Sequence, residues 1–375
     1  MKKLIIITTL FVLLIFITII AFLIHTSNNS KPGRIVYYKG GSLLSTSLNG
    51  KQTIDLSKLG TQGNPIFVSK NKIKMYFVRD SNIWSANTDG SQLKQITKNV
   101  TIEPSFDISL IGANDDGTKL LFSYELPDIM GIPDANRCIK YGVHYYDSIA
   151  DLIYYVGEAP YIKKGEFYYH YYFTGFIGDN PIYAQNLDGY YYRLDPIKNK
   201  FYKYTRMPMP GIVHTSYFNI KKNLLVYDCH YANLGQETWK DSVASDSHSQ
   251  IILVSLDNYS KTYISPAGNY AEYQYLSVSP NFENVVYGHQ MGGSKRTYYS
   301  YNINSRHIKP LSKIHATYLV PLWLDDETFL YADQKPLATF YKYNLKTDDI
   351  TKYIENIDYY IIPNKWFNLT RVLYY

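Results

Sequence analysis

The residue types best suited to chemistry concentrate between positions 228 and 290. Histidines and carboxylates in this stretch are His230, Glu237, Asp241, Asp246, His248 and His289, with Gln290 beside the last of them. Imidazole nitrogens and carboxylate oxygens are ligands of divalent metal ions, so His230, His248 and His289 are candidate metal ligands. Their spacing reproduces no specific metal motif, however, and scattered loop histidines are more often solvated. We therefore predict no metal and no other cofactor.

Other catalytic signatures are absent from the sequence. It contains no G-x-S-x-G elbow of a serine hydrolase and no G-x-G-x-x-G or phosphate-binding loop. Asp directly precedes Gly in "ANTDGSQ" and "ANDDGTK", so these segments match turns rather than the Asp-x-Gly of a sialidase Asp-box. Peptidase activity and nucleotide chemistry are not supported.

The composition is that of a globular chain. The 375 residues are 46% hydrophobic, and 38 Lys and Arg stand against 32 Asp and Glu, a formal net charge of +6. Beyond Lys2-Lys3 the basic residues form no dense block, so no nucleic-acid partner is predicted. Tyrosine, at 41 residues, is the outlier and favours β-structure. We interpret the excess as packing between sheets rather than a stacking surface for ligands.

The N-terminus predicts a membrane anchor. Residues 4–24, "LIIITTLFVLLIFITIIAFLI", carry no charge and no proline, and as a helix they would extend about 31 Å. Lys2 and Lys3 place the N-terminus in the cytoplasm by the positive-inside preference. A cleaved signal peptide is the alternative, but the apolar run is long and "LIHTSNNS" offers no A-x-A-like site. We expect a signal-anchor over residues 1–25, a polar linker over 26–33, and the remaining domain in the periplasm or outside the cell.

A strand–turn–strand pattern recurs along the rest of the chain. Hairpins of about sixteen residues begin at Ser42, Asn82, Gly142, Tyr190, Gln250, Thr297 and Thr339. A second type of apolar pair precedes most of them, at 65–78, 107–125, 166–185, 216–228, 275–289 and 318–333. Each unit thus holds four strands, A to D, at the 40-to-60-residue spacing of propeller blades.

These units predict an all-β fold, a seven-bladed β-propeller of four-stranded blades over residues 34–375, preceded by one transmembrane helix. The chain ends on another pair, Tyr359–Tyr375, whereas the hairpin at Ser42 has no complete pair before it. We expect both termini to share one blade and close the ring. "RIVYY" (34–38) and "RVLYY" (371–375) both resemble strand B of that blade, so one of them must pair elsewhere.

Two blades carry a family resemblance. "SPNFENVVYG" (279–288) resembles the S-P-D-G signature of TolB-like propeller repeats, and "IWSANTDGSQLKQIT" (83–97) is similar to the strand pair that follows it in that family. Gly117 keeps the turn glycine, whereas Phe282 and the "KNK" at 70–72 do not. The resemblance implies a scaffold that most often serves protein–protein contact in the periplasm or at the cell surface. The fold alone does not decide the function.

The sequence has two cysteines and does not decide whether they form a disulfide. Cys138 and Cys229 stand 91 positions apart and could form a disulfide outside the cytoplasm. We consider two separate thiols in different blades the better interpretation. No C-x-x-C motif is present, so redox catalysis is not indicated.

The predicted working surface is the face from which the B–C connections emerge. Two of these are long, Leu126–Gly142 in the third blade and Cys229–Gln250 in the fifth. Strand B ends on that face present Asp80, Glu125, Gln185, Asp228, His289 and Asp333. We expect Trp239 and Tyr231 to act as aromatic anchors and His230 and His289 as polar contacts, with Gln290, Asp228, Glu125 and Asp333 beside them.

The predicted function is that of a non-enzymatic module that binds a protein or glycan partner outside the cytoplasm. The alternative is an extracytoplasmic carbohydrate-active enzyme that resembles the metal-dependent uronate lyases and uses the same face.

Overall fold

The computed structural model describes most of the chain from Gly33 onward. The described residues are 33–61, 66–97, 107–125, 142–158, 162–164, 167–169, 171–185, 190–206, 212–219, 221–231, 248–265, 271–291, 296–315, 321–333 and 338–360. The chain divides into two compact units, Met1–Gly33 and Arg34–Tyr375. Within the described ranges no helix has the length and apolar character needed to cross a membrane, and the predicted anchor at 4–24 lies outside them.

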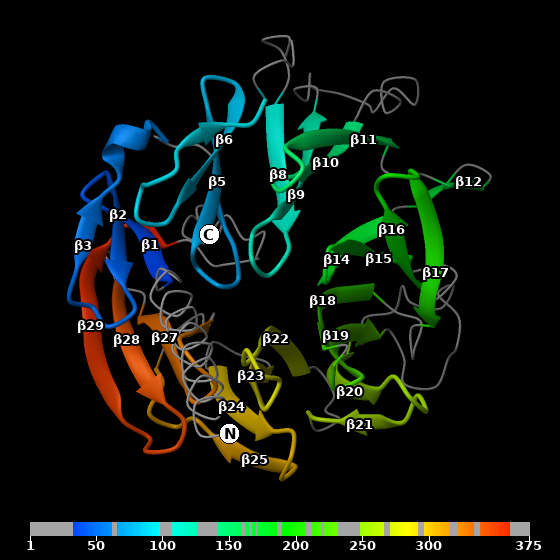
Figure 1. Ribbon diagram of the computed structural model, residues 1–375. Coiled ribbons are helices and arrows are strands. Elements are labelled where there is room, and N and C mark those ends of the chain that lie inside the picture. Colours follow the sequence, from blue (N-terminus) through cyan, green and yellow to red (C-terminus); the bar gives the residue numbers. More distant parts are fainter. Residues whose placement is uncertain are drawn as a thin grey trace, which may run out of the picture. The chain divides into compact units, whose positions relative to one another are not determined.

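The described part of the second unit contains seven four-stranded antiparallel sheets, here called blades 1 to 7, and one two-stranded sheet (Figure 1). Blade 1 contains β1 (Arg34–Lys39), β2 (Ser42–Ser47), β3 (Thr53–Asp55) and β30 (Tyr359–Tyr360), and the 3-10 helix η1 (Ser57–Leu59) follows β3. Blade 2 contains β4 (Ile66–Val68), β5 (Lys74–Arg79), β6 (Asn82–Asn87) and β7 (Lys94–Gln95). Blade 3 contains β8 (Asp107–Ala113), β9 (Lys119–Glu125), β10 (Gly142–Asp147) and β11 (Leu152–Glu158).

The remaining four blades follow the same order of strands. Blade 4 contains β14 (Tyr171–Ile177), β15 (Asn180–Gln185), β16 (Tyr190–Asp195) and β17 (Lys200–Arg206). Blade 5 contains β18 (Ile212–Asn219), β19 (Leu224–Tyr231), β20 (His248–Ser255) and β21 (Lys261–Tyr263). Blade 6 contains β22 (Ala271–Val278), β23 (Asn284–Met291), β24 (Arg296–Asn302) and β25 (His307–Pro310). Blade 7 contains β26 (Leu322–Trp323), β27 (Thr328–Asp333), β28 (Ala338–Asn344) and β29 (Ile350–Ile357).

The predicted C–D hairpins are confirmed. Their first strands begin at the predicted residue in blades 1 to 4 and within two residues of it in blades 5 to 7, at His248, Arg296 and Ala338. Alternating apolar residues specify these strands, and turn residues that tolerate positive φ end them. Gly50 and Gly90, for example, have φ of 76° and 81° in the C–D turns of blades 1 and 2.

Seven hydrophobic clusters among the described residues hold the blades together, and each one joins two neighbouring blades. Val36 of blade 1 packs with Phe77 of blade 2, for example, and Leu330 of blade 7 packs with Ile35 of blade 1. Every pair of successive blades, including the last and the first, therefore shares a core. The predicted seven-bladed propeller is confirmed.

Tyrosines fill much of these interfaces. Fully buried side chains include Tyr76, Tyr146, Tyr227 and Tyr287, each in a cluster between two blades. Burying a phenol requires a partner for its hydroxyl. Tyr76 Oη of blade 2, for example, donates to the Gly117 carbonyl of blade 3 at 2.5 Å. The interpretation of the tyrosine excess as packing between blades is confirmed for these residues.

One predicted segment is divided differently. The predicted apolar pair at 166–185 would begin in the aromatic run "EFYYHYYF" (166–173). Instead, β13 (Phe167–Tyr169) pairs with β12 (Ile162–Lys164) in a separate two-stranded sheet, and β14 begins at Tyr171. A run of aromatics has high β-propensity throughout, so the sequence does not mark the break between two strands.

The two ends of the propeller meet in blade 1, as predicted. β30 pairs with β1 through Tyr360 opposite Tyr37 and Tyr359 opposite Tyr38. The C-terminal part therefore supplies strand A, and β1 is strand B. The competing segment "RVLYY" (371–375) lies outside the described residues, and the prediction that Tyr359–Tyr375 forms a complete A–B pair stays untested beyond Tyr360.

Deleting residues 359–375 should therefore open the ring. The truncation removes the β30 partner of β1 and leaves β1 as an unpaired edge strand of blade 1. We expect loss of cooperative thermal unfolding and aggregation, measured by calorimetry and light scattering. A truncated chain that melts like the full-length protein would refute closure by β30.

Candidate functional site

The propeller has two faces that differ in their connections. Because strands alternate in direction within each blade, the A–B and C–D turns emerge on one face, here called the turn face. The B–C and D–A connections emerge on the other, here called the connection face. The long segments 126–141 and 232–247 follow β9 and β19, both B strands, so both belong to the connection face. The segments themselves lie outside the described residues, and so do Trp239, Glu237, Asp241, Asp246 and Cys138.

The B strands end on the connection face, as predicted, but two of them run further than expected. Glu125, Gln185 and Asp333 are the last residues of β9, β15 and β27. β19 continues to Tyr231 and β23 to Met291, so Asp228 and His289 lie inside their strands rather than at the ends. His230, Tyr231 and Gln290 therefore lie closer to the strand ends than Asp228 and His289 do.

Blade 5 brings three predicted residues together at one end of a strand pair. His248 begins β20 and stands directly opposite Tyr231 of β19, and His230 is opposite Ser249. Cys229, one position further in, is opposite Gln250. His289 lies on β23 of blade 6, opposite Thr297. Within the described ranges no group of three or more metal-binding side chains comes together, and a role for these residues stays a prediction.

Asp80 is one of the six polar residues predicted at the ends of B strands, and its contacts are resolved in atomic detail. It follows β5 with φ of 50°, and its Oδ2 lies 3.6 Å from Arg79 Nε. The Arg79 guanidinium lies over the Trp84 ring at 3.7 Å from the centroid and donates from Nη1 to the Leu59 carbonyl of blade 1 at 3.2 Å. These contacts tie blade 2 to blade 1. Asp80, one of the six predicted polar ends, thus has a structural partner.

The turn face carries polar contacts that link A–B turns of neighbouring blades. Asn71 of blade 2 donates from its backbone N–H to the Asp115 carbonyl of blade 3 at 3.0 Å. Asn281 of blade 6 donates from its backbone N–H to Asp326 Oδ1 of blade 7 at 2.7 Å. Both donors replace the Asp that the S-P-D-G pattern has at this turn position. We call these turn-to-turn contacts the turn girdle.

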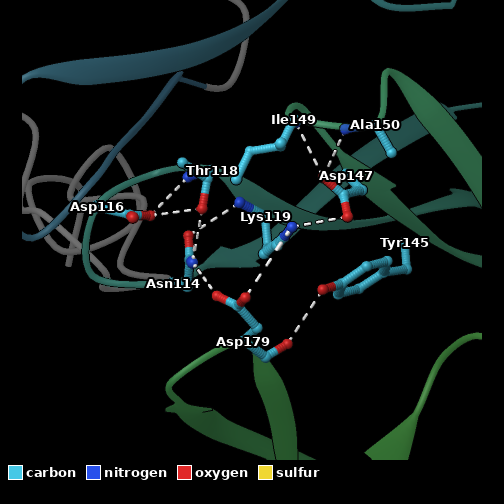
Figure 2. Close-up of polar contacts among 9 residues, drawn as sticks. All are labelled: Asn114, Asp116, Thr118, Lys119, Tyr145, Asp147, Ile149, Ala150 and Asp179. Atoms are coloured by element: carbon cyan, nitrogen blue, oxygen red, sulfur yellow. Dashed lines mark hydrogen bonds and ion pairs between the residues drawn. The ribbon is translucent and has the colours of Figure 1, made fainter.

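An ion pair within blade 3, Lys119 with Asp147, lies beside the contacts that link blade 3 to blade 4 (Figure 2). Lys119 of β9, whose side chain is only 7% exposed, places Nζ 2.7 Å from Asp147 Oδ2 and 4.0 Å from Asp179 Oδ2. Asn114 Nδ2 donates to Asp179 Oδ1 at 2.8 Å, and Tyr145 Oη donates to the Asp179 carbonyl at 3.1 Å. Asp179 of the blade 4 turn is thereby held by three residues of blade 3.

The electrostatics of Asp147 follow from these contacts. Burial acts to raise the pKa of its carboxyl, but the hydrogen bond from Lys119 and those from the Ala150 and Ile149 backbone N–H groups outweigh it and lower the pKa. The carboxylate is thus charged and fully engaged. Sequence reasoning missed this cluster, although the acidic turns "NDDGTK" and "GDN" were visible.

Gly117 shows how closely these turns approach. It has φ of 71°, and a Cβ there would lie 2.8 Å from Ser69 Cβ and 2.7 Å from Lys74 Cβ of blade 2. Only glycine fits. The equivalent positions in blades 2 and 6 are Lys72 and Phe282, which keep positive φ of 61° and 58° and bury their side chains.

No family model matches the chain, and no curated protein matches its sequence. Solved structures do match. TolB from Acinetobacter baumannii is 11% identical over 89% of this chain and 65% of its own, with a TM-score of 0.41. An oligogalacturonate lyase in complex with manganese is 11% identical over 84% of this chain and 70% of its own, with a TM-score of 0.37. A prolyl endopeptidase is 12% identical over 88% of this chain and 49% of its own, with a TM-score of 0.55.

The resemblance to TolB-like propellers holds in the broad sense. At these identities the likenesses show the fold alone, and of the three only the prolyl endopeptidase has a TM-score above 0.5. The chain spans less than two thirds of the TolB chain and about half of the prolyl endopeptidase chain.

Proposed function

We propose that the chain is a membrane-anchored propeller that binds a protein partner outside the cytoplasm without catalysing a reaction. Residues 4–24 serve as the anchor, and the connection face is the binding surface. The resemblance to TolB-like repeats supports a protein partner, because that scaffold most often serves protein–protein contact. A glycan bound on the same face, with or without lyase activity, is an outcome of the test below.

The difference between the two faces carries the proposal. On the turn face, Asn71, Asn281 and Asp179 form hydrogen bonds with neighbouring blades. The connection face instead receives the two long segments, 126–141 and 232–247, and the end of the β19–β20 ladder with Tyr231 opposite His248. Long connections on a rigid scaffold are where binding residues concentrate. Trp239 lies in one of these segments and His289 on the adjacent blade.

The combined change Trp239→Ala and His289→Ala is expected to weaken partner capture at least tenfold, about 1.4 kcal/mol, with little change in melting temperature. The reason is that an aromatic anchor and a polar contact are lost from a surface that contributes little to the core. The measurement is quantitative capture by the tagged full-length protein from native membranes. Capture that instead responds to oligogalacturonate and divalent ions would favour the lyase-like alternative.

The matched control is Asn71→Ala with Asn281→Ala on the turn face. These changes remove the inter-blade hydrogen bonds that the side-chain amides of Asn71 and Asn281 donate to the Asp116 carbonyl and to Asp326 Oδ2. They should lower stability by about 1 to 2 kcal/mol and leave capture intact. The reverse pattern, normal capture by the first variant and lost capture by a stable second one, would place the site on the turn face.

A further inference from the structure

Large apolar side chains are exposed at the outer rim of blades 3, 4 and 5. Ile149 and Ile197, at the C–D turns of blades 3 and 4, are 77% and 72% exposed, and Tyr259 at the C–D turn of blade 5 is 48% exposed. Exposed apolar residues on the outer strands of the same blades accompany them. We define the rim patch as Ile149, Leu152, Tyr155, Ile197, Tyr204, Tyr259 and Tyr263.

The other blades provide an internal comparison. At the turn position of Ile149 and Ile197, blades 1, 2, 5, 6 and 7 carry Asn49, Asp89, Asp257, Asn304 and Lys346. The C–D turn therefore does not require an apolar residue there. Blades 3 and 4 thus expose isoleucine where the other five carry polar residues, and blade 5 exposes Tyr259 two positions further on, where the other six carry polar residues. Blade 2 also exposes Leu93, between β6 and β7. Large apolar side chains exposed on neighbouring blades are typical of an interaction surface.

Basic residues are concentrated around the blade 4 and blade 5 part of the patch. Residues 190–206 and 251–265 together hold six Lys and Arg but only two acidic residues, Asp195 and Asp257. Asp195 lies 3.7 Å from Lys198 Nζ, and Asp257 accepts a hydrogen bond from Asn223. These two ranges therefore carry a net charge of +4, out of +6 for the whole chain, and the local field around blades 4 and 5 favours an anionic partner. The blade 3 part, residues 142–158, holds three acidic residues and no Lys or Arg, and two of the three, Asp147 and Asp151, are paired with Lys119 and Lys94.

Aromatic and basic side chains are interleaved in this region and continuous across the two blades. Lys203 Nζ lies 3.9 Å from the centroid of the Tyr190 ring, and the Thr205 hydroxyl of blade 4 is 3.1 Å from the Tyr259 hydroxyl of blade 5. The described part of the patch consists of turn tips and strand edges. Turns and outer strands offer a partner a broad surface rather than a cleft.

The direction of β1 supplies a separate argument. β1 is a B strand, so Arg34, its first residue, lies at the turn face, where its N–H donates to the Lys72 carbonyl in the blade 2 A–B turn at 2.9 Å. The C–D turns of the rim patch belong to the same face. The propeller thus begins, at Arg34, on the face that carries Ile149 and Ile197.

We propose that the rim patch lies against an anionic lipid surface. Tyrosine is a typical residue of the membrane interface, isoleucine side chains insert into it, and nearby lysines are attracted to an anionic leaflet. This inference rests on the proposed anchoring by residues 4–24. It would hold the turn face at the membrane and leave the connection face directed away from it, toward a partner.

The test compares the full chain in nanodiscs of phosphatidylcholine alone and of phosphatidylcholine with phosphatidylglycerol. The anchor is present in both, so only the rim patch should respond. Oxidative labelling of Ile197, Tyr204, Tyr259 and Tyr263, measured by mass spectrometry, should fall at least about fivefold in the anionic discs. The protection should disappear at about 1 M salt because charge attraction is screened.

Charge variants distinguish the effect of lysines near the rim patch from that of lysines elsewhere on the surface. Lys200→Gln, Lys203→Gln and Lys261→Gln together should abolish the protection. The matched triple variant, Lys51→Gln, Lys342→Gln and Lys346→Gln, removes exposed lysines from blades 1 and 7 and should retain it.

Two results would refute the rim patch as a lipid-binding surface. A third would refute the anchor and leave the rim patch to be tested by itself. Equal labelling in both disc types, with the chain resistant to carbonate extraction, refutes the rim patch and leaves the anchor intact. Protection by soluble polyglutamate but not by anionic discs refutes a lipid partner and indicates an acidic polymer. If carbonate releases the chain, the anchor is refuted, and flotation of the released chain with anionic vesicles then decides the rim patch by itself.

Discussion

Replacing Lys119 with methionine should lower the free energy of unfolding by about 2 to 3 kcal/mol. The change leaves the Asp147 carboxylate without its ammonium partner at 2.7 Å and removes the charge near Asp179. Breaking a buried pair by removing one partner costs about 3 to 5 kcal/mol, and the partial exposure of Asp147 places this case at or below the lower end. Denaturant unfolding of the full-length chain measures the difference.

A double-mutant cycle and a surface control test the cause. Adding Asp147→Asn should recover a large part of the loss, because the unpaired charge is then gone. Lys198→Met removes an exposed lysine, 3.7 Å from Asp195, and should change stability by no more than about 0.5 kcal/mol. Similar losses in Lys119→Met and Lys198→Met would show that the buried pair has no special weight.

The same pair predicts a response to acid. Because the pKa of Asp147 is lowered in the folded state, its contribution is present above the unfolded pKa of about 3.9 and is lost as the pH falls through the folded value. The stability gap between the wild type and Lys119→Met should therefore close below about pH 4. A gap that persists at that pH would contradict the ion-pair explanation.

The architecture could be predicted from the sequence because it repeats. The hairpins at Ser42, Asn82 and Gly142 each show alternating apolar residues around a turn of Asn, Asp or Gly, and a local pattern seen seven times fixes both strand pairing and blade number. The end of β13 at Tyr169 was missed because aromatic residues continue on both sides of it.

The contacts between blades were less predictable. Lys119 and Asp179 are 60 positions apart, and only the packing of blade 3 on blade 4 brings them together. The candidate site is harder still to predict from the sequence. The positions of the strand ends follow from the blade topology, whereas the contacts made by the long connections do not follow from it. The extension of β19 past Asp228 to Tyr231, for example, depends on pairing with β20 and has no local signal.

Lys72 was visible in the sequence as a departure from the turn glycine, and the structure shows its consequence. Its side chain is 8% exposed, with φ of 61°, and the burial lowers the pKa of the ammonium to about 8, with a further contribution from Lys70 and opposition from Asp325. Keeping this lysine charged in the fold is unfavourable. Lys72→Met preserves most of the packing and removes the charge.

We therefore expect Lys72→Met to raise the free energy of unfolding at pH 7 by on the order of 2 kcal/mol. The sign of the pH dependence follows from linkage. Between about 8 and 10.5 the unfolded wild type binds more protons than the folded form, so wild-type stability rises with pH relative to the variant, and the advantage of the variant shrinks across this window. Parallel denaturant titrations of both proteins from pH 7 to 10 measure it.

The matched control is Lys51→Met, at an exposed position of the blade 1 C–D turn, which should give a difference near zero at every pH. A Lys72→Met variant that is no more stable at pH 7, or whose advantage does not change with pH, would mean that the ammonium is already satisfied in the fold. The expected result would instead show that this chain tolerates an unfavourable buried charge on the turn face. The charge lies beside the start of the propeller, because the Arg34 N–H donates to the Lys72 carbonyl.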